Sequence, residues 1–159
     1  MEKAQEIRFM ELALREAEMA AQAGEVPVGA VVVLDGKVIA RGHNRTERDG
    51  DPTAHAEMVV IRKASKKMGN WRLSAAELYV TLEPCTMCIG AAVLARIDRL
   101  IFACKDPKSG AVGSLYDISK ESRLNHKIKV SQGILEEECS QVLKLFFKQL
   151  RTSARKKVP

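Results

Sequence analysis

The sequence predicts an α/β fold: a three-layer α/β/α sandwich in which helices cover both faces of a mixed sheet of about five strands. Two observations predict it. Segments whose apolar residues recur at helical spacing alternate with short, apolar, β-branched runs along the chain. In addition, only Asp35 and Gly36 separate the first two of those runs, and an Asp-Gly pair suits the positive φ angles of a hairpin turn. The sheet should therefore open with a hairpin.

The first third of the chain supplies one helix and this hairpin. Residues 7–23 have apolar side chains at helical spacing, and Gly24 is a typical helix stop. The two hairpin strands are expected over residues 26–34 and 37–40. Residues 41–53 are polar and rich in Gly, Asn and Asp, so we expect them to form a loop.

The rest of the chain continues the alternation of helices and strands. Residues 105–114 contain Gly, Ser and Pro and form a loop that is long enough to suggest a function. The last helix carries three glutamates in its first turn, where the helix dipole favours anions. The expected elements are helices over 55–68, from 83 to about 95 and from 135 onward, and strands over 78–82, 99–103 and 128–130.

Length and composition predict a single soluble domain. A chain of 159 residues can bury a core, and 46% hydrophobic with 29% charged residues is ordinary for a globular protein. The sequence contains no run of about 18 apolar residues, which a transmembrane helix requires. Its first six residues lack the apolar stretch of a secretory signal. We therefore expect a cytoplasmic protein without a membrane partner.

The distribution of charge favours a polyanionic partner. The formal net charge is +6, and the sequence from Lys144 to its end has six basic residues and no acidic one. A solvated, partly frayed tail is the alternative interpretation. Basic and apolar residues form two adjacent stripes at helical spacing: Lys144, Lys148, Arg151 and Arg155 beside Val142, Leu143, Phe146, Phe147 and Leu150.

Two motifs carry the candidate chemistry. A His-x-Glu motif opens one expected helix at His55, and a Pro-Cys-x-x-Cys motif opens the next. We expect Pro84 in the first turn of that helix, with Cys85 and Cys88 on one face near the positive end of the dipole, which favours thiolates. Two thiolates and one imidazole suit Zn²⁺ with one coordination position left for water.

Glu57 is the residue that would turn this metal site into an enzyme. Positions i and i+2 do not share a face of a regular helix, so His55 and Glu57 can converge only at a helix start. There the glutamate would take a proton from a water made acidic by the metal and pass it to a ring nitrogen of a base.

Other interpretations of the two motifs stay open from the residues alone. His-x-Glu occurs by chance in many chains. Cys-x-x-Cys is common in structural zinc sites, and the site would be closed if Cys104 or Cys139 were a fourth ligand. For these two cysteines burial in the core is the favoured interpretation. The two motifs together, about thirty residues apart, favour catalysis.

At these motifs the chain resembles the zinc-dependent cytidine/deoxycytidylate deaminase superfamily of nucleoside and nucleobase deaminases. Within it, the chain is similar to the bacterial tRNA-specific adenosine deaminases over nearly its whole length. The matching segments are residues 24–30, 43–44, 52–57, 78–88, 106–110, 125–126 and 146–151. The last three of them are more specific than the zinc motif, which the whole superfamily shares.

The resemblance implies a cytidine deaminase-like sandwich in residues 1–151, followed by a basic C-terminal tail at 152–159. It implies a homodimer that hydrolyses the wobble adenosine of a tRNA anticodon stem-loop to inosine, with one Zn²⁺ per chain. His55, Cys85 and Cys88 would bind the zinc, and Glu57 would shuttle protons. The residues implied to bind the RNA are Asn44, Asp106, Lys108, Asn125, Phe147 and Arg151.

The pattern of the residues alone does not decide several of these roles. Phe146 and Phe147 both fall on the apolar stripe, where core packing is favoured, and only the resemblance assigns Phe147 to RNA. Asn44 and Asn125 would otherwise be turn residues, and Trp71 belongs to a core or an interface. Two competing functions remain: a deaminase of free bases such as guanine or cytosine, and a zinc-stabilised RNA-binding module without catalysis.

Overall fold

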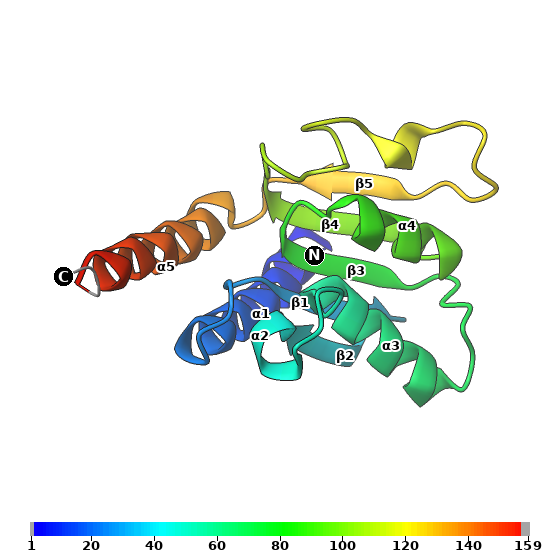
Figure 1. The fold of residues 1–159 in the computed structure, drawn as a ribbon. Coiled ribbons are helices and arrows are strands. Elements are labelled where there is room, and N and C mark those ends of the chain that lie inside the picture. The colour runs from blue at the N-terminus through cyan, green and yellow to red at the C-terminus, as the bar shows by residue number, and fades with distance from the viewer. Residues whose placement is uncertain (1, 157–159) are drawn as a thin grey trace.

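The protein, described over residues 2–156 in a computed structural model, contains one five-stranded sheet with strand order β2-β1-β3-β4-β5 (Figure 1). In chain order its elements are α1 (Glu2–Gln22), β1 (Gly29–Leu34), β2 (Lys37–His43), α2 (Thr46–Asp49), α3 (Ala56–Met68), β3 (Glu77–Leu82), α4 (Thr86–Leu94), β4 (Arg99–Cys104), the short 3-10 helix η1 (Ile118–Lys120), β5 (Lys129–Gln132) and α5 (Glu136–Lys156).

The sheet is mixed, and its first two strands form the expected hairpin. β1 pairs antiparallel with β2 and β3, whereas β3, β4 and β5 run parallel. The hairpin turn has positive φ angles at Asp35 (51°) and Gly36 (74°), as a tight two-residue turn requires. Both the mixed sheet and its opening hairpin are therefore confirmed.

Alternate residues of each strand supply two separate cores, one on each face of the sheet. On one face Val31, Val33 and Tyr79 pack against α1 and the beginning of α5. On the other, Val32 and Leu78 pack against α3 and α4. Helices thus cover both faces, and the three-layer sandwich is confirmed.

The expectation of a loop over residues 41–53 is wrong in two places. β2 continues to His43, and Gly42 is needed there because a Cβ at this position would lie 2.8 Å from the side chain of Val59 on α3. The short helix α2 then begins at Thr46. Its first backbone N–H groups donate to the carboxylate of Glu25, which lies far back in the sequence and so gives no local signal.

The two terminal helices are longer than their patterns predict. α1 begins at Glu2 instead of residue 7, and α5 continues through Lys156, so residues 152–156 of the expected tail are helical. Residues 157–159 lie outside the described part of the chain. The second half of α5 projects beyond the edge of the sandwich (Figure 1). In residues 2–156, no helix has the length and apolarity to cross a membrane.

Trp71 is not a core residue. It is 58% exposed after α3, and the guanidinium groups of Arg72 and Arg96 lie 5.0 and 5.8 Å from its ring centroid. The core alternative is therefore wrong, and the interface alternative stays a prediction.

Candidate metal centre and active site

The three candidate metal ligands lie at the N-termini of two helices. His55 is the N-cap of α3 and Cys85 the N-cap of α4, both with extended backbone (φ −71°, ψ 154° and φ −77°, ψ 176°), and Cys88 lies in the first turn of α4. Pro84 thus precedes the N-cap, so its expected place in the first turn is wrong. Both helix dipoles direct their positive ends at the ligands and favour thiolates there.

The ligand atoms have the spacing of a tetrahedral zinc site. Nδ1 of His55 lies 3.5 Å from Sγ of Cys85 and 3.5 Å from Sγ of Cys88, and all three atoms lie within 4.8 Å of one another. Zinc bonds of ~2.3 Å to sulfur and ~2.0 Å to nitrogen give an S···N separation of about 3.5 Å at tetrahedral angles. The donor set and its spacing therefore fit this ion.

A metal ion held by these three residues would keep an open coordination position. Cys104 and Cys139 are buried among the side chains that pack against α1, on the far face of the sheet, and neither joins the cluster of His55, Cys85 and Cys88. Their expected burial in the core is confirmed. A closed, structural zinc site needs a fourth protein ligand, and neither of the other two described cysteines supplies it.

A hydrogen bond between the two cysteines at the site shifts their pKa values in opposite directions. It lowers the pKa of Cys85 to about 4 and raises the pKa of Cys88 above its ordinary value. Because a metal binds cysteine as thiolate, a divalent cation bound by both sulfurs would release the proton of Cys88.

Glu57 occupies the second position of α3 and is 4% exposed. Since His55 is the N-cap of the same helix, the two side chains converge at the helix start, as their spacing requires. Burial raises the pKa of Glu57 to about 7. A carboxyl group with such a pKa can both accept and release a proton near neutral pH.

A cavity of about 410 Å³ opens in front of these residues and is large enough for a nucleoside. His55, Glu57 and Cys85 form part of its wall. Asn44 also lines it, with its Nδ2 donating to the Val26 carbonyl (3.1 Å) and its Oδ1 accepting from the Ala56 N–H (2.8 Å). The Asn44 amide thus connects the cavity wall to the first turn of α3.

Comparison with known proteins decides the family. A family model for the MafB19-like deaminases matches residues 4–151. A tRNA-specific adenosine deaminase of Bacillus subtilis is 50% identical over 143 residues, which cover 90% of this chain and 89% of that protein. One from Agrobacterium fabrum is 50% identical over 148 residues, covering 93% and 97%.

This chain belongs to the tRNA-specific adenosine deaminase family. A solved structure from a study of A-to-I editing by tRNA:A34 deaminases at the wobble position of transfer RNA has a TM-score of 0.83 and 51% identity, and covers 86% of this chain and 99% of that one. A guanine deaminase from Nitrosomonas europaea is more distant, with a TM-score of 0.74 and 25% identity, covering 88% and 83%. The family and the cytidine deaminase-like fold inferred from the motifs are confirmed.

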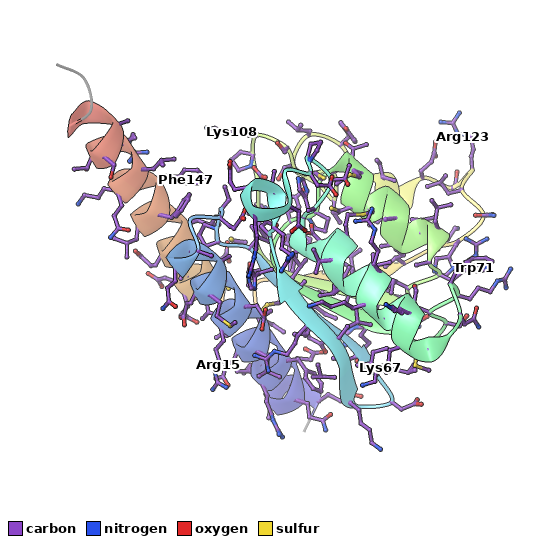
Figure 2. All side chains as sticks on the ribbon, turned by 60° about the horizontal axis from the view of Figure 1, so that its bottom comes forward. Arg15, Lys67, Trp71, Lys108, Arg123 and Phe147 are labelled. Carbon is purple, nitrogen blue, oxygen red and sulfur yellow. The ribbon has the colours of Figure 1, made fainter. Side chains whose placement is uncertain are left out.

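The predicted RNA-binding residues of this deaminase fall into two neighbouring hollows and one distant loop. Asn44 and Asp106 line the main cavity. Lys108, Phe147 and Arg151 line an adjacent groove of about 340 Å³, between the loop after β4 and the flank of α5. Figure 2 shows Lys108 and Phe147 at the same end of the molecule.

Asn125 is not brought together with these residues. It is exposed in the loop before β5, next to the beginning of β4, where the Lys129 N–H donates to the Asp98 carbonyl. Cys104, at the opposite end of β4, is the residue that adjoins the groove. Arg123 of the same loop lies across the molecule from Lys108 in Figure 2. A role for Asn125 stays a prediction.

Part of the cavity wall was not anticipated from the sequence. Phe146, Leu150 and Glu25 are among the residues that line the catalytic cavity of this deaminase, whereas Phe147 lines the groove beside it. The apolar stripe on α5 could have indicated Phe146 and Leu150, but it equally predicts core packing. The only local sign of a role for Glu25 is that it is a single carboxylate followed by an apolar run.

Proposed function

We propose that this deaminase hydrolyses the wobble adenosine of a tRNA anticodon to inosine and ammonia, with one Zn²⁺ held by His55, Cys85 and Cys88. The observation that carries the proposal is Glu57, a buried carboxyl group with a pKa near neutrality on the wall of a cavity beside an open metal site. Relatives named tRNA-specific adenosine deaminases, at 50% identity, support the substrate.

Glu57 would act as the proton carrier of the reaction. Zinc at such a site lowers the pKa of a water molecule in its open position to about 7 and so supplies the nucleophile for C6 of adenine. With zinc bound, the Glu57 carboxylate would take one proton of this water and deliver it to N1 of the ring as the C6–O bond forms. It would then move the proton of the new C6 hydroxyl group to the amino group, so that the C6–N6 bond breaks, ammonia leaves and C6 becomes a carbonyl.

Asn44 would orient the base in the cavity. One of its two N–H bonds is directed to Val26 and its carbonyl oxygen is bound by Ala56, so the remaining N–H is available to an acceptor on the substrate. Because both anchors hold the side chain in one orientation, this donor is preorganised. Burial of the amide excludes water that would compete for it.

The proposal is tested by comparing substrates. The protein is expected to convert adenosine in an anticodon stem-loop, and to leave free guanine and cytosine unchanged. Inosine is detected after nuclease digestion, and the free-base reactions are followed by ammonia release. Efficient turnover of a free base without turnover of the stem-loop would show that the substrate is wrong while the deaminase chemistry is right.

The groove beside the cavity would bind the phosphates that flank the adenosine. Four cations line it, namely Lys105, Lys108, Lys144 and Arg151, and its lining holds no carboxylate. The ring of Phe147 is 39% exposed at the same groove, as a residue that stacks on an unpaired base requires.

Removing one of these cations should weaken RNA binding and change its salt dependence. In Lys108→Ala or Arg151→Ala, the slope of log affinity against log salt concentration should become shallower by about one, because one phosphate contact is lost. Lys67→Ala is the matched control, since Lys67 is an exposed cation on α3, distant from Lys108 in Figure 2. The measurement is a fluorescence anisotropy titration of a labelled stem-loop at several salt concentrations. Equal slopes in Lys108→Ala and Lys67→Ala would exclude the groove.

We further propose that two chains pair through the outer face of α4. This helix is apolar all round, and its outer residues Met87, Gly90, Ala91 and Leu94 carry no charge, with Leu94 70% exposed. Such an uncharged, exposed helix face is typical of a homodimer interface. In sedimentation the protein is expected at twice the chain mass and Leu94→Glu at the chain mass. A monomeric parent protein would contradict the pairing.

Because tRNA is the proposed substrate, we place the protein in the cytoplasm.

A further inference from the structure

Glu83 is a buried carboxylate that no step of the proposed reaction uses. It lies between β3 and Cys85 and is 2% exposed. Its carboxylate accepts four hydrogen bonds, and all four come from the loop that follows β4. The donors are the backbone N–H groups of Asp106 (3.0 Å), Val112 (2.9 Å) and Ser114 (3.1 Å) and the hydroxyl group of Ser114.

The backbone on either side of Glu83 strengthens this connection. The Ala111 N–H donates to the Pro84 carbonyl (2.9 Å), and Gly110 pairs with Cys85 in an isolated antiparallel bridge. Gly110 is required for this approach, because a Cβ at that position would lie 2.3 Å from the Glu83 carboxylate. The loop is thus packed directly against the turn that carries a metal ligand.

The same loop contributes to both hollows of the site. Asp106 and Ser109 line the catalytic cavity, and Lys108 lines the adjacent groove. Within the loop, the Asp106 carboxylate accepts from the N–H groups of Lys108 (3.1 Å) and Ser109 (3.3 Å), so these three residues form one hydrogen-bonded unit. The distance between this unit and Cys85 is therefore set through Glu83.

We propose that Glu83 is a positioning residue that holds the loop over residues 106–114 in register with Cys85, so that both hollows accept the RNA at once. The inference rests on the proposed function. A carboxylate can accept from all four donors, whereas a glutamine offers one oxygen and turns an N–H₂ group toward the remaining donors. Hydrogen bonds to a charged acceptor are also stronger than neutral ones.

The test compares the zinc-loaded parent protein with Glu83→Gln, Ser114→Ala and Glu16→Gln. Ser114→Ala removes one of the four donor groups. Glu16→Gln is the matched control, because Glu16 is also buried and binds Arg41 (2.9 Å) and His43 (2.8 Å), away from the loop. For each protein, amide hydrogen exchange, zinc content, and kcat and KM for the stem-loop are measured well below its unfolding temperature.

In Glu83→Gln we expect faster exchange at Asp106, Val112 and Ser114, full zinc content, and a KM raised about tenfold with kcat changed much less, the signature of lost binding outside the chemical step. Ser114→Ala should change the same quantities in the same direction, but less. Glu16→Gln should leave KM and exchange of the loop unchanged.

Two results would overturn the inference: unchanged loop exchange in Glu83→Gln, or a KM equal to that of Glu16→Gln. If Glu83 had a merely structural role, Glu83→Gln and Glu16→Gln would both have a lower unfolding temperature than the parent protein, but their KM values would be the same. Failure of the proposed function gives a different result, because the parent protein would then leave the stem-loop unmodified.

Discussion

Glu57→Gln is expected to lower the single-turnover rate constant of inosine formation by about 10²- to 10⁴-fold, the range that general acid–base catalysis contributes. Glutamine has nearly the same size as the buried glutamate, so it preserves the packing at the start of α3. However, it can neither take a proton from water nor deliver one to N1 of adenine. The measurement is single-turnover conversion of a stem-loop RNA at saturating enzyme concentration.

Two properties of Glu57→Gln should stay at the level of the parent protein. Glu57 is not among the three candidate metal ligands, so the zinc content should remain one per chain. RNA affinity should also be kept, since the groove residues are untouched. This combination distinguishes an enzyme from a zinc-stabilised RNA-binding module. Turnover at the parental rate would contradict the assigned role of Glu57.

Cys88→Ala is expected to abolish metal binding and activity together and to lower the unfolding temperature. Cys88 contributes one of only two thiolates, and its loss leaves His55 and Cys85 at the starts of two separate helices without a common third ligand. A metal that binds only the folded state adds about 4 kcal/mol of stability at a concentration 1,000 times its dissociation constant. Removing zinc from the parent protein with a chelator should reproduce the effect.

Cys139→Ala serves as the control for this loss of metal. Cys139 is 1% exposed and lies on the far face of the sheet, so its truncation disturbs the core without touching the site. We expect its zinc content to equal that of the parent protein by elemental analysis. One equivalent of zinc in Cys88→Ala, or none in Cys139→Ala, would be incompatible with the proposed ligand set.

The sequence predicts the sandwich and the metal centre well because their signals are local. The Asp35-Gly36 turn, the β-branched strands and the two helix-opening motifs each lie within a few consecutive residues. The requirement that His55 and Glu57 meet at a helix start is also local, and the N-cap position of His55 satisfies it.

The features that could not be predicted from the sequence depend on contacts between segments that are distant along the chain. Helix α2 begins where Glu25 accepts two backbone N–H groups, a contact across more than twenty residues. Glu83 likewise reaches a loop that begins beyond the next strand. Both carboxylates lie in segments that match the family, but nothing in those segments indicates their hydrogen-bond partners, which become visible only in three dimensions.

The last helix illustrates a second limit of sequence patterns. An apolar stripe normally predicts a buried helix face, which places Phe146 and Phe147 together in a core. Because α5 projects beyond the sheet, the two rings instead enter different hollows, Phe146 the catalytic cavity and Phe147 the groove. Periodicity indicates which side of a helix is apolar, but it does not indicate whether that side packs in the core or lines a substrate-binding cavity.

Deamination of adenosine at the wobble position of a tRNA anticodon can be measured directly on this protein. The most direct measurement incubates the zinc-loaded protein with an anticodon stem-loop that carries adenosine both at the wobble position and elsewhere in the loop, and maps inosine by sequencing. We expect inosine at the wobble position alone, and none after zinc is removed. An unmodified wobble adenosine in the presence of zinc, with the RNA bound, would contradict this expectation.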